Sequence, residues 1–362
     1  MGKIYINGRF LTQKTTGVQR VAIETIKQID LLLDKYREYN ITLLVPKGSI
    51  ITIELNNIIV KQIGKNKGHI WEQIDLPLYV KKETLVNFCN TAPVFKKNQI
   101  VYIHDMAIQD APEGFSKKFV LVYKLLFKKI TRNARKIITV SNFSKERILN
   151  YYPNVHNKIS VSYLGVNHFS LDYNKRKDLE ILKSFKLVER KYFLAVSSAN
   201  PNKNFSIISR MLAETSNNWE EEFVFVGSNN STVFRNNNIE TKSIRYLGYV
   251  SDDELHALYR NARLFIFPSK YEGFGLPPIE AMRLGCQVIA NKSASIPEIL
   301  EDKARYFDGD SINSLEQALS NINKNNQISR TELMNFVNEK YNWKETASHL
   351  MRKIKEIQGD IR

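Results

Sequence analysis

Hydrophobic positions along the chain fall into two kinds of pattern. Short β-branched or aromatic runs predict strands, and apolar residues three or four positions apart predict helices. Helical spacing runs from Val18 to Ile29, and again from Asp252 through Leu255 and Leu258. The predicted strands are Lys3–Ile6, Ile41–Val45, Thr84–Phe88, Ile100–Ile103, Ile137–Val140, Ile159–Val161, Tyr192–Val196, Phe223–Val226, Leu264–Phe267 and Val288–Ala290.

The predicted strands form two series, each alternating with helical segments. Such alternation favours parallel sheets with helices on both faces. A polar and charged stretch between Gly165 and Arg190 separates the two series. We therefore expect an α/β fold of two Rossmann-like, doubly wound parallel-sheet domains facing across a cleft. Ligands of such sheets bind beyond the carboxyl ends of the strands.

Composition supports this picture and excludes several classes of protein. The chain has 362 residues, of which 43% are hydrophobic and 25% charged. These values suggest two globular domains and exclude collagen-like or largely disordered chains. Cys89 and Cys286 match no metal or redox spacing, so a disulfide framework is not expected. The first residues contain no apolar signal segment, and we expect a cytoplasmic protein.

The positive charge is concentrated in the first part of the chain. Residues 1–200 contain 33 basic and 16 acidic residues, a net charge of +17, whereas the remainder has a net charge of −1. This asymmetry indicates an anionic partner, which could be a membrane, a nucleic acid or a phosphorylated substrate.

The densest basic segment is Lys117–Lys136, which has eight basic residues and no acid. One interpretation is a helix that lies on anionic lipid at the inner face of the cell membrane. The other is a solvated surface helix whose apolar stripe packs on its own domain. The apolar residues at helical spacing are Phe119, Val120, Tyr123, Leu126, Phe127 and Ile130.

The segment Leu264–Leu300 has the strongest signs of chemistry. Its strand leads into a glycine-containing loop, and Pro277 and Pro278 then open a helix. Backbone amides at a helix N-terminus suit a phosphate group. Glu272 and Glu280 frame this loop, and sugar or ribose hydroxyls are good donors to a carboxylate. Alternatively, Glu280 complements the helix dipole in the first turn. A glycosidase pair would need both carboxylates beside one bond, a distance that the sequence does not give.

The segment from Glu272 to Glu280 resembles the E-x7-E signature of glycosyltransferase family 4, the retaining nucleotide-sugar glycosyltransferases. The resemblance covers nearly the whole chain and implies a GT-B fold. It divides the chain into an acceptor-side domain at 1–170, a linker at 171–190, a donor-binding domain at 191–340 and a returning helix at 341–362. Further matching segments, in chain order, are Thr16–Arg20, Tyr102–Asp105, Thr139–Lys145, Tyr246–Val250 and Tyr341–Trp343.

The resemblance also implies roles for individual residues. Lys203 would neutralise the donor pyrophosphate, because a lysine ammonium is a compact point charge. The donor-binding residues would be Gly17, Lys203, Val250, Phe274, Gly275, Leu276 and Glu280. The catalytic residues would be His104, Asp105 and Glu272.

One loop departs from the family pattern. Many relatives have glycine where Ser197 stands and an arginine in the loop that here contains Ser198 and Asn202. A single cation would then hold the diphosphate, which puts donor affinity in doubt.

The function implied is a retaining hexosyltransferase that uses a nucleotide-sugar (UDP-, GDP- or dTDP-linked). Its acceptor would be a glycan, such as a polyprenyl-diphosphate-linked oligosaccharide of lipopolysaccharide O-antigen or capsule biosynthesis. No metal or other cofactor is expected, and no nucleic acid. The alternatives are a non-catalytic GT-B partner protein and a nucleotide-sugar epimerase of the same fold. A glycan phosphorylase would need a pyridoxal phosphate lysine, and a nucleic-acid-binding module would need a different fold.

Overall fold

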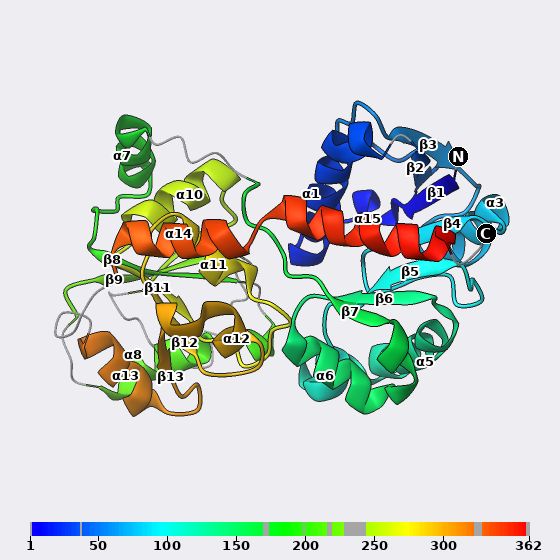
Figure 1. The fold of residues 1–362 in the computed structure, drawn as a ribbon. Helices are drawn as coiled ribbons and strands as arrows, with labels where there is room; N and C mark the ends of the chain where they lie inside the picture. Colours follow the sequence, from blue (N-terminus) through cyan, green and yellow to red (C-terminus); the bar gives the residue numbers. More distant parts are fainter. Residues whose placement is uncertain are drawn as a thin grey trace. The chain divides into compact units, whose positions relative to one another are not determined.

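The computed structural model describes residues 2–36, 38–168, 174–197, 200–215, 219–227, 244–321 and 328–359. Contacts divide the chain into two compact units. Unit 1 consists of residues 1–168 and 341–362, and unit 2 of residues 169–340. Each unit is built on one sheet of parallel strands, so the predicted class of two doubly wound α/β domains is confirmed (Figure 1).

Unit 1 contains a seven-stranded sheet in the order β3-β2-β1-β4-β5-β6-β7. The order reverses between β1 and β4, which makes the carboxyl ends of these two strands the switch point of the sheet. The strands are β1 (Gly2–Asn7), β2 (Tyr39–Pro46), β3 (Ile59–Ile63), β4 (Thr84–Asn87), β5 (Gln99–Tyr102), β6 (Lys136–Thr139) and β7 (Ile159–Val161).

Successive side chains of β5 show how both faces of this sheet are covered. Ile100 and Tyr102 belong to the core beneath α1 and α15, whereas Val101 belongs to the core beneath α5 and α6. Alternation along a strand places neighbouring side chains on opposite faces. The helices of unit 1 are α1 (Gly17–Leu32), α2 (Gly68–Ile70), α3 (Leu76–Val80), α4 (Ala107–Asp110), α5 (Lys117–Asn133), α6 (Asn142–Tyr151) and α15 (Trp343–Gly359), and Trp71–Asp75 joins α2 to α3 as a π-helical turn.

Helix α15 comes from the end of the chain and completes the core of unit 1 beside α1 (Figure 1). Its buried side chains include Leu350, Met351 and Ile354. The helix starts against Gly165, where an added Cβ would lie 2.1 Å from the backbone nitrogen of Trp343. Only glycine permits this approach of two backbones.

Unit 2 contains a six-stranded sheet in the order β10-β9-β8-β11-β12-β13. The order reverses between β8 and β11, so the switch point lies at the carboxyl ends of these strands. The strands are β8 (Tyr192–Ser197), β9 (Glu222–Gly227), β10 (Ile244–Gly248), β11 (Leu264–Phe267), β12 (Val288–Asn291) and β13 (Arg305–Phe307).

Helices cover both faces of this second sheet, with α10 and α14 on one face and α8 and α13 on the other (Figure 1). Helix α10 begins at a capping box, in which the Ser251 hydroxyl accepts from the Glu254 amide and the Glu254 carboxylate accepts from the Ser251 amide. The helices of unit 2 are α7 (Lys175–Ser184), α8 (Ser206–Glu214), α10 (Asp252–Asn261), α11 (Leu276–Arg283), α12 (Ile296–Leu300), α13 (Ile312–Ser320) and α14 (Arg330–Lys340).

Part of the segment predicted as a linker is helical. Residues 175–184 form α7, whose buried Asp178 accepts hydrogen bonds of 2.8 and 2.7 Å from the guanidinium of Arg260 on α10. This pairing attaches α7 to unit 2. The polar composition of the segment reflects a small surface helix rather than a connection without structure.

All ten predicted strands occur in the structure, and the described residues contain three further strands that the sequence analysis missed. Strands β3, β10 and β13 lie at sheet edges. Edge strands face solvent along one side, so β3 has charged and polar residues at Lys61 and Gln62 and lacks a buried apolar run.

The predicted basic helix is shorter than expected. Helix α5 ends at Asn133, and Lys136 begins β6 instead. Most of its predicted apolar stripe packs inward, with Phe127 and Ile130 fully buried, as the surface-helix interpretation requires, whereas Phe119 at the start of the stripe is 38% exposed. Three further apolar side chains remain exposed on α5, namely Leu121 at 61%, Val122 at 49% and Leu125 at 59%.

Candidate functional site

The loops at the switch point of unit 2 bring Lys203 and Glu272 together. Lys203 ends a short 3-10 turn after β8, and Glu272 lies in the loop after β11. The Lys203 ammonium lies 2.6 Å from Glu272 Oε1, with side-chain exposures of 26% and 14%. Because parallel strands end at one edge of the sheet, two residues 69 positions apart become neighbours.

Hydrogen bonds to backbone carbonyls hold the loop after β11 against the loop after β8 and against side chains from the end of β12 and the segment after it. The Lys270 amide donates to the Asn202 carbonyl at 2.8 Å, which links the β11 loop to the β8 loop. The Ser295 hydroxyl donates to the Glu272 carbonyl at 2.9 Å. The Asn291 amide donates to the Ser269 carbonyl at 3.1 Å. These bonds fix the backbone on both sides of the Lys203–Glu272 pair.

The Gly275 position requires glycine. Its φ is +95°, and an added Cβ would lie 2.7 Å from Cδ1 of Ile296. Gly275 is the N-cap of α11, and the amides of Gly275 and Leu276 donate no hydrogen bond to any residue that the structure describes. Amides at a helix N-terminus suit an anionic ligand. Phe274 packs inward and is 4% exposed.

Two other predicted donor-binding residues lie at different places on unit 2. Glu280 is half-buried and is the fifth residue of α11, so its predicted place in the first helical turn was wrong. The helix-dipole interpretation of Glu280 loses its basis, because dipole effects fall off within the first turn. Val250 follows β10, two strands from β8, which is about 10 Å across the sheet. Ser198 lies outside the described residues.

Unit 1 contains the remaining predicted site residues. His104 follows β5, is 5% exposed, and its Nε2 lies 2.6 Å from the Phe88 carbonyl. Burial lowers the pKa of His104 to about 4, although the bond to Phe88 partly opposes the shift. The ring is therefore neutral at pH 7. Because a carbonyl only accepts, Nε2 carries the hydrogen and Nδ1 is the acceptor.

Asp105 and Gly17 have local structural roles in unit 1. The Asp105 carboxylate accepts from the Ala107 amide at 2.9 Å, at the start of α4. Gly17 is exposed and is the first residue of α1, after Thr16, which caps the helix with Gln19. These positions do not test the binding roles predicted for either residue.

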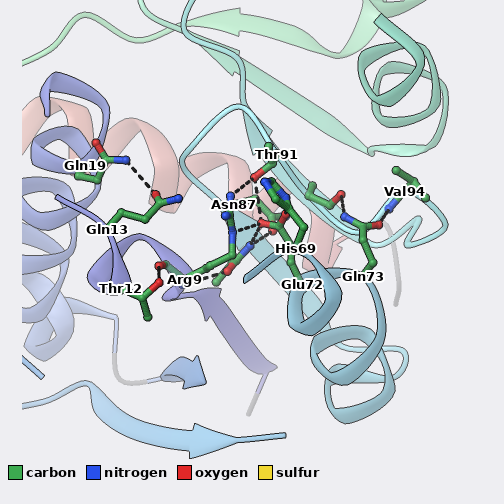
Figure 2. A network of polar contacts seen from close by, with 12 residues as sticks. Arg9, Thr12, Gln13, Gln19, His69, Glu72, Gln73, Asn87, Thr91 and Val94 are labelled. Carbon is green, nitrogen blue, oxygen red and sulfur yellow. Dashed lines mark hydrogen bonds and ion pairs between the residues drawn. The ribbon is translucent and has the colours of Figure 1, made fainter. Parts of the chain in front are cut away.

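A buried polar network at the switch point of unit 1 was missed by the sequence analysis. Glu72 Oε1 accepts from Asn7 at 2.8 Å, from Arg9 at 3.1 Å and from Thr91 at 2.9 Å. Figure 2 shows Arg9, Glu72 and Thr91 converging from three segments. His69 Nδ1 lies 3.4 Å from the other carboxylate oxygen of Glu72, Oε2, and the His69 side chain is 56% exposed. The only sequence signal is a glycine and an arginine directly after the first strand.

The ionisation of Glu72 follows from its partners. Burial acts to raise the pKa of Glu72, but its bond to His69, the Arg9 charge and the bonds from Asn7 and Thr91 outweigh burial and lower it. Glu72 and Arg9 are 1% and 6% exposed, so the pair is an internal one. The network joins the segment after β1 to the turn that contains Glu72 and to the segment after β4.

Comparison with known proteins agrees with this architecture. Residues 177–343 match the family model described as glycosyl transferases group 1. The O-antigen chain mannosyltransferase B of Escherichia coli is 26% identical over 60% of this chain and 58% of its own length. The O-antigen chain mannosyltransferase RfbU of Salmonella typhimurium is 28% identical over 70% of this chain and 71% of its own length.

Solved structures share the fold over the whole chain. The sucrose-phosphate synthase of Thermosynechococcus elongatus superposes with a TM-score of 0.73 at 14% identity, covering 99% of this chain and 100% of that one. Anabaena HepE, in complex with UDP and glucose, gives 0.70 at 14% identity, covering 98% and 100%. The chain thus has the GT-B fold, and its residues 177–343 are similar to the family described as glycosyl transferases group 1.

Proposed function

We propose that this protein is a retaining glycosyltransferase that moves mannose from a nucleotide-linked donor to a glycan acceptor in O-antigen biosynthesis. The observation that carries the proposal is the Lys203–Glu272 pair at the switch point of unit 2, beside the amides that begin α11. The similarity to two O-antigen mannosyltransferases supports the choice of sugar and process. An acceptor on a polyprenyl diphosphate would suit the positive charge of unit 1.

Transfer breaks the bond between the sugar anomeric carbon and the donor phosphate oxygen, and it forms a bond to an acceptor hydroxyl oxygen. Lys203 and the amides of Gly275 and Leu276 would stabilise the negative charge that develops on the departing diphosphate. Glu272 would accept a hydrogen bond from a sugar hydroxyl. The acceptor attacks from the side that the diphosphate leaves, and its proton passes to a phosphate oxygen of the leaving group. No nucleophile on the protein is required.

His104 would act in this scheme as a hydrogen-bond acceptor. Its neutral ring directs Nε2–H to Phe88, so Nδ1 offers a lone pair to a sugar hydroxyl or to developing positive charge. An imidazolium would repel the oxocarbenium-like transition state, and burial prevents its formation at pH 7.

Calorimetric titration with UDP, GDP, dTDP and ADP tests the donor site. We expect one nucleotide to saturate the protein and Glu280→Ala to weaken its binding. No binding of any nucleotide to folded protein would favour the non-catalytic alternative. An NMR time course with the matching nucleotide-mannose then tests the stereochemistry, and an inverted product would contradict the proposed mechanism.

We also propose that the outer face of α5 contacts an anionic membrane surface. Leu121, Val122 and Leu125 are exposed among lysines that no acid of this helix neutralises. The helices in the described parts of the chain include none that is both long and apolar enough to cross a bilayer. Replacing Lys124, Lys128 and Lys129 with glutamate should weaken sedimentation with anionic liposomes, and unchanged sedimentation would refute this contact.

A further inference from the structure

A lysine-rich pocket lies on unit 1, between the end of α3 and the segment that leads into β5. Its volume is about 420 Å³. Four lysines line it, two from each segment, together with Phe95. The four lysines are Lys81, Lys82, Lys96 and Lys97. Neither the sequence motifs nor the proposed transfer reaction uses these residues.

The central cation of this pocket is incompletely compensated. Lys96 is 8% exposed, and its ammonium donates to the Lys81 carbonyl at 2.7 Å. Burial lowers the pKa of Lys96, and the charge of Glu83 opposes the shift. Within the described parts of the chain, no carboxylate forms an ion pair with any of the four lysines. A buried ammonium with one neutral partner gains from an added anion.

The strained backbone at Lys81 places its carbonyl oxygen beside the Lys96 ammonium. Lys81 has a φ of +51°, in the region that favours glycine. This conformation ends α3 and turns the Lys81 carbonyl toward the Lys96 ammonium. Strain of this kind persists where the surrounding structure enforces it, and it is common at ligand sites.

Exposed apolar side chains occur in both segments that form the pocket, and one of them, Phe95, lines it. Phe95 is 80% exposed and Leu78 is 70% exposed. Ile70 and Ile74 precede Leu78 at four-residue spacing and are 59% and 50% exposed. Gln73 fixes the two segments side by side, since its side chain donates to the Ala92 carbonyl at 2.9 Å and accepts from the Val94 amide at 3.0 Å.

We propose that this pocket binds the phosphate group of an anionic phospholipid while Phe95 and Leu78 enter the acyl boundary of the membrane. A soluble anion would be bound by the lysines alone and would give no reason for the exposed Phe95 at the pocket and the exposed Leu78 on the adjoining helix. Cations around an apolar group are instead the composition of a membrane-interface site. The pocket segment also contacts α5, because the Asn133 amide donates to the Val94 carbonyl at 2.6 Å. This inference goes beyond the transferase activity and holds whether or not that activity is correct.

Sedimentation of the full chain with phosphatidylglycerol–phosphatidylcholine vesicles tests the pocket. We expect the Lys82→Gln/Lys97→Gln variant to bind at least tenfold more weakly, since each lysine near an anionic surface contributes about fivefold. Lys35→Gln/Lys47→Gln is the matched control, because both lysines are exposed on unit 1 outside the pocket. An equal loss in both variants would overturn the proposal and indicate net charge alone.

The Phe95→Ser variant separates a lipid from a free anion. We expect it to lose vesicle binding while titration with glycerol 1-phosphate is unchanged. Vesicle binding equal to that of the parent would refute the lipid assignment and leave a small-anion pocket. Circular dichroism and thermal melting of every variant check that the protein is folded. Nucleotide titration reports on unit 2, so it distinguishes failure of this inference from failure of the proposed function.

Discussion

Replacing Glu272 with glutamine should strengthen the binding of a nucleoside diphosphate and, at the same time, slow sugar transfer. The Lys203 ammonium already lies 2.6 Å from Glu272 Oε1. A diphosphate bound to the Lys203 ammonium would therefore lie close to the Glu272 carboxylate, which is bonded to the same ammonium, and the two negative groups would repel each other. Two oxygens bonded to one ammonium lie about 5 Å apart at ordinary hydrogen-bond lengths. The glutamine variant keeps the shape of the site and removes this repulsion.

The size of the effect follows from that separation. Two like charges about 5 Å apart repel by about 3 kcal/mol at an effective dielectric constant of about 20, and by about 0.8 kcal/mol in water. With side-chain exposures of 26% and 14%, the site lies between these limits. A value of about 1.4 kcal/mol corresponds to a tenfold gain in affinity. Lys203→Gln should do the opposite and weaken binding at least tenfold.

Calorimetry with the nucleoside diphosphate measures both affinities, and a transfer assay measures turnover. Glu214→Gln is the matched control, because Glu214 is exposed at the end of α8 that points away from the switch point. Equal or weaker diphosphate binding by Glu272→Gln would refute the shared-ammonium argument. Unchanged turnover would refute the role of Glu272 toward the sugar.

Further predictions concern the backbone, the buried groups and metal. Gly275→Ala should weaken nucleotide binding and cost about 1–2 kcal/mol or more in stability, because φ is +95° there; unchanged calorimetry and melting would contradict this. Glu72→Gln leaves Arg9 buried without a charged partner and should cost about 3–5 kcal/mol by urea unfolding, whereas the exposed Glu180→Gln should have no measurable effect. Because the folded pKa of Glu72 is lowered, its contribution to stability is present above the unfolded value and is lost as pH falls through the folded one. The imidazole NMR signal of His104 should titrate near pH 4 rather than 6.5. Because the folded pKa is the lower one, the free energy of unfolding should decrease by up to about 3 kcal/mol as the pH falls from 6.5 to 4. A titration midpoint above pH 6 would show that the ring is not buried. Chelation with EDTA should leave transfer unchanged, and loss of activity restored by a divalent cation would show a metal requirement.

The sequence predicted the architecture well because buried parallel strands have a strong local signal. Strand β11, for example, is buried throughout, and its predicted bounds match the structure. The β8 and β11 loops were singled out through the family resemblance, and the structure brings Lys203 and Glu272 of these loops together at the switch point. By contrast, edge strands such as β3 have too few buried apolar side chains to be recognised from the sequence.

Contacts between distant residues could not be predicted from local pattern. Arg9 and Glu72 are 63 positions apart, and neither has a neighbour that marks it as buried. The contact between two of the pocket lysines could not be predicted either. Lys81 and Lys96 are 15 positions apart, and the sequence gives each the pattern of an exposed cation. What brings each pair together is the packing of loops, and that depends on the complete fold.

The return of α15 to unit 1 has a consequence for how this protein is made. Leu350, Met351 and Ile354 of α15 are buried in the same core as β1, which begins at Gly2. Unit 1 therefore begins to leave the ribosome first but is completed last. Unit 2 is a continuous segment and can fold while unit 1 waits with part of its core uncovered. An exchange of unit 2 between relatives should therefore be made as an insertion after residue 168 and before residue 341. A chain cut at residue 340 would leave the apolar face of α1 open to aggregation.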